Sequence, residues 1–499
     1  MPTKIILANL SGIKSMPDGR WRHLVKAGSR WPMTIGYARH VDYYPFPFSL
    51  AYGTALLKRS FPDLDVQGID GVVDDLDDDA LFRRLQLSPP DIFISEVTLI
   101  TLNDDLAFIK RVKSSFKCMV IVTGVYPSVF LENIFLNDTP IDYAIYGEYE
   151  LSLDRLVRVV VDGNDPVAAR CIPGIIFKNN DGIFKHKQRA AIQDLNALPC
   201  PDRQDFPPDK YADFAVHFPC VSIMASRGCP AGCVYCVERH VIYASPGYRM
   251  RDPLMVVDEM LYCRDVLGAK QFYFDDQSLV VNKGYITSLC AEMQRRALNT
   301  PWTCMADAMF LERPSLDMMA EAGCIGIKFG VESANEAILK HIHKPLDLIK
   351  VKEVVAWCRA LKISTHATFC VGLPHESEQT LGQTTSFIKA LDVDSAQVSR
   401  AVPYPGTPFY TWAKENGFLR TEDLDLFDGM SSSVLNYPQL SSGKIDLWYE
   451  KISRIAARRK LMNYIRHPWR SFFVLIYMLK HQGFKKPFSA LTVFLGRSY

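Results

Sequence analysis

Short apolar runs alternate with amphipathic stretches along the first 165 residues. The runs predict strands at Lys4–Leu10, Val66–Ile69, Ile92–Ser95, Val120–Thr123 and Tyr143–Ile145. The stretches between them have helical length and spacing, at Leu50–Ser60, Asp79–Leu85, Asp105–Ser115 and Leu151–Val161. This alternation is typical of a parallel sheet covered by helices on both faces. Residues 1–165 are therefore expected to form a doubly wound, Rossmann-like α/β domain.

The same alternation returns over residues 216–440. Strands are expected at Ala215–Met224, Gln271–Phe274, Trp302–Met305, Ile325–Phe329, Ser364–Cys370 and Ser395–Ala401. Helices are expected at Pro253–Leu267, Lys283–Ala297, Ser315–Ala322, Ala334–Ile342, Ile349–Leu361 and Glu378–Leu391. Six βα units in succession predict a partial (β/α)6 barrel of the TIM type, with its chemistry at the C-terminal ends of the strands.

A segment rich in Pro, Asn and Asp, residues 166–215, separates the two series. It contains Asn179-Asn180-Asp181-Gly182 between apolar runs, which is typical of a hairpin turn. We expect a linker with a small hairpin.

The last part of the chain, residues 441–499, is expected to be a small helical tail. Residues 451–499 contain 11 Lys or Arg and no Asp or Glu, interleaved with aromatic residues. The apolar content of Phe472–Leu479 and Phe488–Leu495 is high for a nucleic-acid-binding arm. Two interpretations stay open: peripheral contact with an anionic membrane surface, or a docked helical cap with a solvated basic side.

The composition is that of an ordinary globular protein, with 48% hydrophobic and 22% charged residues and a net charge of +2. This balance predicts no nucleic-acid partner. The longest apolar run is far shorter than the ~20 residues of a membrane-spanning helix. Thirteen scattered cysteines favour a reducing compartment. We expect a cytoplasmic protein, with the inner membrane surface as an alternative peripheral location.

Three cysteines, Cys229, Cys233 and Cys236, stand close together after the apolar run Val221–Met224. Closely spaced thiolates hold iron–sulfur clusters, and three of them leave one iron of a 4Fe-4S cubane open to a small chelating molecule. S-adenosylmethionine (SAM) offers the required amine and carboxylate. A structural zinc ion requires four ligands, and the nearby His240 is not at a common zinc spacing. The pattern therefore favours a 4Fe-4S cluster over zinc or coincidence.

The cysteine motif and several other segments resemble the cobalamin-binding branch of the radical SAM superfamily, which includes methyltransferases and enzymes like the anaerobic magnesium-protoporphyrin ester cyclase. The resemblance covers roughly residues 1–420. In the barrel it rests on Phe272 to Asp276, Gly330 to Ser333, Gly372 to Pro374 and Pro403 to Thr407. In the first domain it rests on Pro45 to Pro47 with Ser49 to Tyr52, on Gly124 to Pro127 and on Tyr146 to Glu150.

The resemblance implies roles for the first barrel segments. Cys229, Cys233 and Cys236 would ligate the cluster, and Tyr235 would pack on it or touch the adenine of SAM. Asp275 and Asp276 stand where the family receives the amino group of SAM, although a pair of helix N-caps explains them equally well.

Further barrel residues follow the later strands. Glu332 and Ser333 would contact the ribose or the methionine part of SAM, and a buried Glu at a strand end needs such a partner. Gly372 would shape the loop after the fifth strand, as ordinary turn chemistry also allows. Many relatives carry an Arg after the third strand, whereas Asp307 stands here, so a contact to the SAM carboxylate at that place is in doubt.

In the first domain the resemblance implies a cobalamin site. Six residues at expected strand ends would line it: Ser95, Thr98, Gly124, Tyr126, Gly147 and Glu148. Open α/β sheets bind ligands at that edge, and glycines allow close approach of a flat corrin. The motif that supplies a His ligand to cobalt is absent, and neither His23 nor His40 stands in its context, so no such ligand is expected from this domain. The alternative is a degenerate domain that has lost cobalamin.

The resemblance implies an enzyme that cleaves SAM at a 4Fe-4S cluster to a 5′-deoxyadenosyl radical and modifies an unactivated carbon. Cobalamin-dependent C-methylation is the favoured reaction, and radical cyclisation or rearrangement is the alternative within the family. A different class, a regulatory protein that binds cobalamin or SAM without turnover, is disfavoured by the intact cysteine motif. The expected partners are a small-molecule or lipid-like substrate and an electron donor such as flavodoxin or ferredoxin. No stretch of the sequence names the substrate.

Overall fold

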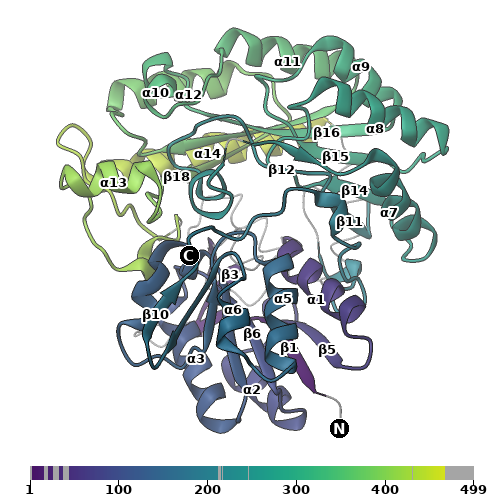
Figure 1. The fold of residues 1–499 in the computed structure, drawn as a ribbon. Helices are drawn as coiled ribbons and strands as arrows, with labels where there is room; N and C mark the ends of the chain where they lie inside the picture. Colours follow the sequence, from purple (N-terminus) through teal and green to yellow (C-terminus); the bar gives the residue numbers. More distant parts are fainter. Residues whose placement is uncertain are drawn as a thin grey trace.

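A computed structural model describes residues 3–15, 21–25, 33–36, 44–211, 215, 217–245, 247–429 and 431–466. The chain folds into two lobes, and Figure 1 shows the N-terminal lobe below the larger C-terminal lobe. The two expected series of strands and helices correspond to these lobes.

The N-terminal lobe is built on one seven-stranded sheet of order β10-β9-β8-β7-β6-β1-β5. Five strands run parallel: β1 (Lys4–Asn9), β5 (Asp65–Asp70), β6 (Ile92–Val97), β7 (Met119–Gly124) and β8 (Tyr143–Ile145). The expected hairpin is formed by β9 (Ile175–Asn179) and β10 (Gly182–Lys185), and β9 pairs antiparallel with β8. The hairpin thus extends the first sheet, which reaches beyond residue 165.

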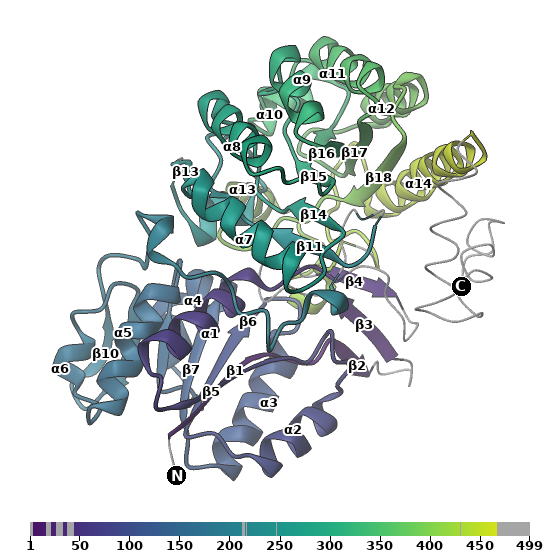
Figure 2. The same ribbon diagram turned by 90° about the vertical axis from the view of Figure 1, so that its right-hand side faces the viewer.

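Helices cover both faces of this sheet, as expected for a doubly wound fold (Figure 2). They are α1 (Phe48–Ser60), α2 (Asp78–Leu87), α3 (Leu102–Ser115), α4 (Val125–Phe130), α5 (Glu150–Val161) and α6 (Pro166–Ala169). Successive residues of β1 enter different cores because side chains alternate along a strand. Ile5 and Leu7 pack with α1 and α5, whereas Ile6 and Ala8 pack with α2 and α3.

A small antiparallel sheet inserted after β1 was not expected from the sequence. It consists of β2 (Ile13–Ser15), β3 (Trp21–Val25) and β4 (Met33–Gly36). The strands are short, and their sequence lacks the longer apolar runs that marked the other strands.

The C-terminal lobe confirms the partial barrel. Six strands pair in sequence order, β11-β14-β15-β16-β17-β18, and every pair is parallel. Their bounds are β11 (Cys220–Ile223), β14 (Gln271–Phe274), β15 (Trp302–Met305), β16 (Cys324–Glu332), β17 (Ser364–Val371) and β18 (Ser395–Arg400). The first strand is shorter than the apolar run Ala215–Met224 indicated.

The barrel helices lie within a few residues of their expected positions. They are α7 (Pro253–Asp265), α8 (Lys283–Arg295), α9 (Arg313–Glu321), α10 (Glu336–His341), α11 (Leu348–Ala360) and α12 (Glu378–Ala390). A further helix, α13 (Pro408–Glu415), was not expected from the sequence. A two-stranded ribbon, β12 (Ser226–Arg227) with β13 (Arg249–Met250), and a turn of π-helix at Glu238–Ile242 flank the cysteine motif.

The described part of the tail is one long helix, α14 (Ser442–Arg466), which packs along β18 at the open edge of the barrel (Figure 2). Residues 467–499, including the aromatic runs that favoured membrane contact, lie outside the described residues. Within the part that is described, none of the helices combines the length and apolar character needed to span a membrane.

Candidate active site

The cysteine motif occupies a loop at the C-terminal end of the first barrel strand, as the sequence predicted. Asp276, which follows β14, accepts hydrogen bonds from the backbone N–H and the hydroxyl of Ser226 and fixes the start of this loop. Gly228 has a φ of +94°, and a Cβ there would collide with the carbonyl oxygen of Gly247, so only glycine fits. The first cysteine therefore follows a tightly defined turn.

Gln277 fastens the two ends of the cysteine loop together. Its Oε1 accepts from the Gly228 N–H at 2.8 Å, and its Nε2 donates to Glu238 at 2.9 Å and to the Tyr243 hydroxyl at 3.3 Å. Sequence reasoning missed this residue, although it directly follows the Asp275-Asp276 pair that the sequence had singled out.

The three cysteines are shielded from solvent to different degrees: Cys233 is buried, and Cys229 and Cys236 are partly exposed. Burial raises the pKa of Cys229 to about 11 and of Cys236 to about 12, and it also raises the pKa of Cys233. The Arg239 N–H donates to the Cys236 sulfur at 3.4 Å. Binding of a metal cluster would displace the protons of these thiols, because the thiolate is the form that ligates a metal.

A zinc site does not fit this geometry. The His240 ring nitrogen Nε2 contacts the Cys233 carbonyl oxygen at 3.0 Å instead of joining the thiols. Across the described ranges, no set of three or more His, Cys, Asp or Glu side chains surrounds a single ion. A cubane differs in that each thiolate binds its own iron, so the three sulfurs surround a cluster and leave one iron open.

The mouth of the barrel beside Cys233 holds a compact group of polar side chains, Tyr235, Asp307, Glu332, Lys344 and Cys370. Lys344 Nζ lies 3.0 Å from Asp307 Oδ2 and 3.8 Å from Glu332 Oε1, and all three side chains are largely buried. The Cys370 thiol donates to Glu332 Oε2 at 3.3 Å. Burial raises the pKa of Glu332 despite the opposing charge of Lys344, and burial with the Glu332 charge raises the pKa of Tyr235.

Two of these residues change the picture drawn from the sequence. Asp307 stands after the third strand, where many relatives carry an Arg, and Lys344 in the loop after α10 places a cation beside it. Lys344 was missed because neither periodicity nor a motif marks it.

The other predicted barrel residues make contacts within the chain. The N-cap of α8 is Asn282, so the cap interpretation of Asp275 and Asp276 is wrong, and both carboxylates are instead buried at the end of β14. Ser333 contacts Thr384 of α12 at 3.5 Å. Gly372, with a φ of +94°, donates its N–H to Glu376, and a Cβ at this position would lie 3.3 Å from Ile445 of α14.

A cavity lies between the lobes, where the carboxyl edge of the first sheet meets the cysteine loop. It is lined by Phe48, Ser49, Glu96, Gly124, Gly147, Glu148, Tyr149, Met224, Arg227, Glu238, Ile242 and Tyr243. Among the predicted cobalamin contacts, Gly124, Gly147 and Glu148 belong to this lining. Gly147 is also needed for packing within the N-terminal lobe, because a Cβ there would collide with the Ala190 carbonyl oxygen.

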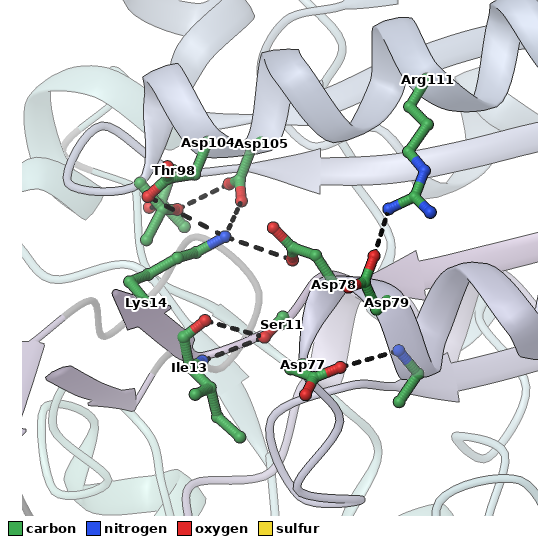
Figure 3. Close-up of polar contacts among 12 residues, drawn as sticks. Ser11, Ile13, Lys14, Asp77, Asp78, Asp79, Thr98, Asp104, Asp105 and Arg111 are labelled. Atoms are coloured by element: carbon green, nitrogen blue, oxygen red, sulfur yellow. Dashed lines mark hydrogen bonds and ion pairs between the residues drawn. The ribbon is translucent and has the colours of Figure 1, made fainter. Parts of the chain in front are cut away.

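The remaining three predicted contacts are not part of the cavity lining. Ser95 is fully buried in β6, and Tyr126 packs on Phe130 with ring centroids 5.3 Å apart. Thr98 belongs to a polar group around Lys14, shown in Figure 3, in which its hydroxyl lies 3.0 Å from that of Thr101. The strand neighbour of Ser95, Glu96, lines the cavity instead, because successive side chains of a strand point to opposite faces.

The lobes are tied together at this cavity by buried ion pairs. Arg227, two residues before Cys229, lies 3.2 Å from Glu148 and 2.7 Å from Glu150 of the N-terminal lobe. Arg249 lies 2.5 Å from Glu148. The carboxylate of Glu148, expected to contact a cofactor, is therefore engaged by two arginines of the barrel lobe.

Comparison with known proteins agrees with this architecture. Residues 223–388 match the Radical SAM superfamily. Over 376 residues the chain is 28% identical to an uncharacterised methyltransferase of Pyrococcus horikoshii, covering 75% of this chain and 80% of that one. It is 24% identical over 434 residues to the anaerobic magnesium-protoporphyrin IX monomethyl ester cyclase of Cereibacter sphaeroides, covering 85% of this chain and 68% of that one.

Among solved structures, the radical SAM methyltransferase TsrM of Kitasatospora setae, with cobalamin and a [4Fe-4S] cluster bound, superposes with a TM-score of 0.62. The superposition covers 89% of this chain and 84% of TsrM at 17% identity, which shows a shared two-lobed fold. The match over residues 223–388 identifies the C-terminal lobe as similar to the Radical SAM superfamily. The two-lobed fold resembles that of cobalamin-binding radical SAM enzymes.

Proposed function

We propose that the protein is a cobalamin-dependent radical SAM enzyme that methylates an unactivated carbon of a small molecule. The observation that carries the proposal is the position of the cysteine loop. It lies at the barrel mouth and is joined through Arg227 to the carboxyl edge of the first sheet, where open α/β folds bind ligands. A cofactor on that edge would face the cluster loop across the cavity.

The chain has residues that could hold both a 4Fe-4S cluster and cobalamin. Cys229, Cys233 and Cys236 would hold the cluster, which when bound supplies the electron that cleaves SAM to a 5′-deoxyadenosyl radical. Gly124, which has a φ of +95° and no side chain, lines the cavity.

Aromatic side chains at Phe48, Tyr149 and Tyr243 provide apolar walls for the same cavity. Cobalamin, when bound there, would carry the methyl group. The cavity measures about 40 Å³. Binding of a corrin therefore requires the lobes to move apart.

The test uses anaerobically reconstituted protein with SAM and a strong reductant. Wild-type protein and the Cys171→Ser control, which changes an exposed cysteine, should bind iron and form 5′-deoxyadenosine. Cys229→Ser should lose both. Added hydroxocobalamin should co-purify with the wild-type protein and give it a cobalamin spectrum. Absence of 5′-deoxyadenosine from a fully loaded cluster would refute the enzyme and favour a regulatory binding protein.

Radical cyclisation remains the second candidate, because the alignment with the cyclase of Cereibacter sphaeroides spans 85% of this chain. Mass spectrometry of the product separates the two reactions. Methylation adds a methyl group to the substrate, whereas cyclisation forms a bond within it and removes hydrogen.

The expected reaction partners are a small-molecule substrate and a reductant such as flavodoxin or ferredoxin. We further propose that the basic tail contacts an anionic membrane. Three residues of its described part, Lys451, Arg454 and Arg458, are exposed, whereas Ile452 and Ala456 face the barrel. Deleting residues 467–499 should move the protein from the membrane pellet to the supernatant, and an unchanged distribution would refute this contact.

A further inference from the structure

One side of the cluster loop lies at the protein surface. Pro230 is exposed and Gly232 is partly exposed, whereas Cys233 is buried beside the barrel mouth. Apart from its chain neighbours, a Cβ placed on Gly232 would have one described atom within 4 Å, the Cβ of His343 at 4.0 Å. Electron transfer slows steeply with distance. A protein that reduces a cluster in this loop must therefore approach it from the side of Pro230 and Gly232.

Three exposed histidines and a tryptophan stand beside this surface. We call them the histidine face, which consists of His341, His343, His375 and Trp412. The Val234 N–H donates to the Ile342 carbonyl oxygen, and the Phe409 N–H donates to the Val234 carbonyl oxygen, both at 3.1 Å. These two bonds join the cluster loop to the end of α10 and to the start of α13. The histidine face is thus fastened directly to the backbone that carries the cysteines.

The rings of the histidine face lie against one another, and two of its residues have unusual backbone. The ring centroids of His341 and His375 are 4.1 Å apart, and those of His375 and Trp412 are 5.2 Å apart. The φ of His343 is +55° and that of His375 is +66°, values that are uncommon for residues other than glycine. Such strain persists where the surrounding structure enforces it and gathers at functional sites. Two instances beside one cluster loop indicate that this surface has a function.

The charges around the histidine face favour an acidic partner. Its two helices carry equal numbers of exposed lysines and glutamates: Lys340, Lys414, Glu336 and Glu415. Burial raises the pKa of Glu376, next to His375, to about 8, so this acid adds little negative charge at neutral pH. Burial lowers the pKa of His240, and the charges of Arg239 and His343 lower it further, so Arg239 adds a cation at this edge. The balance is positive, and complementary charge speeds and orients protein encounters.

We propose that the histidine face is the docking surface for an acidic electron-donor protein, which passes one electron to the cluster. The donor is oxidised by one electron and the cluster is reduced by one, and no bond forms or breaks. Complexes of electron-transfer proteins bury less than about 1,200 Å² in total, so a small platform of rings is sufficient. The inference rests on the proposed function, because it requires a reducible cluster in the cysteine loop.

The test follows reduction of the cluster by stopped-flow absorbance on anaerobic, cluster-loaded, full-length protein with two reductants. Reduced flavodoxin, an acidic protein, has to dock, whereas dithionite is a small ion that needs no docking surface. The double variant His341→Glu with His375→Glu should slow reduction by flavodoxin by about 10-fold or more at low salt, because like charges oppose the encounter. Reduction by dithionite should stay within about twofold of the wild-type rate, since the cluster itself is unchanged.

Two further variants and the salt dependence separate docking from damage to the fold. His341→Ala with His375→Ala removes the rings without adding charge, and it should also slow flavodoxin and spare dithionite. His217→Glu changes an exposed histidine before β11, at the opposite end of the barrel from the cluster loop, and should leave both rates unchanged. Added salt should slow reduction of the wild type by flavodoxin, because it screens attraction between surface charges.

Equal slowing with both reductants, or an unchanged rate with flavodoxin in both double variants, would overturn the proposal. So would a wild-type cluster that dithionite reduces and flavodoxin does not. Reduction is read without turnover, so the result is separable from the proposed function. A cluster that is reduced through this face while no 5′-deoxyadenosine forms would refute the radical reaction and leave the docking surface standing. Formation of 5′-deoxyadenosine with normal flavodoxin rates in the double variants would do the opposite.

Discussion

At the scale of single residues, the site depends on side chains that hold the backbone of the cluster loop and do not themselves touch a ligand. Gln277 is the clearest case, because one amide bonds to residues on both sides of the three cysteines. If the three cysteines hold the proposed cluster, fixing the ends of their loop positions them before the cluster binds.

Gln277→Leu should leave the protein folded but reduce its cluster content. The change leaves the Gly228 N–H without its partner, at a cost of about 1–3 kcal/mol for a buried unsatisfied group. Iron per protein after reconstitution should fall, and the cluster should bleach faster in air. Gln294→Leu, on α8 away from the loop, is the control. Wild-type iron content and stability to air in Gln277→Leu would contradict the role assigned here.

Glu376 is a buried residue whose charge opposes folding. Burial raises its pKa to about 8, although its Oε2 accepts from the backbone N–H groups of Gly372 and Leu373. Its Oε1 has no partner among the described residues. Because the folded-state pKa is above the unfolded value, the stability that the protonated carboxyl provides is complete below the unfolded pKa. It is lost as the pH rises through the folded pKa.

Glu376→Gln should therefore become more stable relative to wild type as the pH rises from about 5 to about 8, by at most about 5 kcal/mol. Urea unfolding at both pH values measures the difference. The control Glu378→Gln changes an exposed carboxylate whose pKa Lys444 lowers, and it should show no such trend. If the difference in unfolding free energy between wild type and Glu376→Gln is the same at both pH values, burial does not raise the pKa of Glu376.

At the scale of elements, the end of β16 shows how one strand places a functional side chain. The glycine at 330 leaves the space into which the Glu332 carboxylate turns, and the register shift allows that turn. The regular pairing of the strand is therefore interrupted at its end, and the Glu332 carboxylate points to the barrel mouth.

Gly330→Ala should destabilise the protein by about 1–3 kcal/mol, because the added methyl group overpacks the space occupied by Glu332. Gly382→Ala is the matched control, since α12 leaves nothing within 4 Å of a Cβ there. That change should stabilise the helix by about 0.5–1 kcal/mol. Denaturant unfolding compares the two variants. Equal stability of Gly330→Ala and wild type would show that Glu332 moves aside freely.

At the scale of the whole molecule, the two lobes meet through charges and not only through apolar surface. Arg227 reaches from the cluster loop to Glu148 and Glu150 at the carboxyl edge of the first sheet. Burial lowers the pKa of Arg227, but the two carboxylates outweigh it and raise that pKa well above the usual value. The arrangement links the cluster loop to the cavity in which a second cofactor is proposed.

Arg227→Met should lower the unfolding free energy by about 3–5 kcal/mol, because it leaves the buried Glu150 without its cation and leaves Glu148 with Arg249 alone. The exposed pair of Arg313 with Asp317 provides the control. Arg313→Met should cost no more than about 0.5 kcal/mol. Thermal unfolding measures both variants. A small effect at Arg227 would show that water reaches the lobe interface.

The sequence by itself determined the elements and the cluster loop. Strands such as β14 and β15 were predicted to the residue, because apolar periodicity and turn signals are local properties of the chain. The three cysteines were recognisable because their ligand spacing is local as well. The β2–β4 insertion was missed, since its strands are short and carry little apolar pattern.

Only the tertiary structure decided which polar residues meet. Lys344 and Asp307 stand 37 residues apart, and Arg227 and Glu150 stand 77 apart, so no local pattern joins them. In the folded protein Ser95, Thr98 and Tyr126 lie outside the cavity lining, whereas Glu96 is part of it. A side chain at a strand end can face either side of a sheet, and the packing of the lobes, not the strand sequence, determines which face meets a ligand.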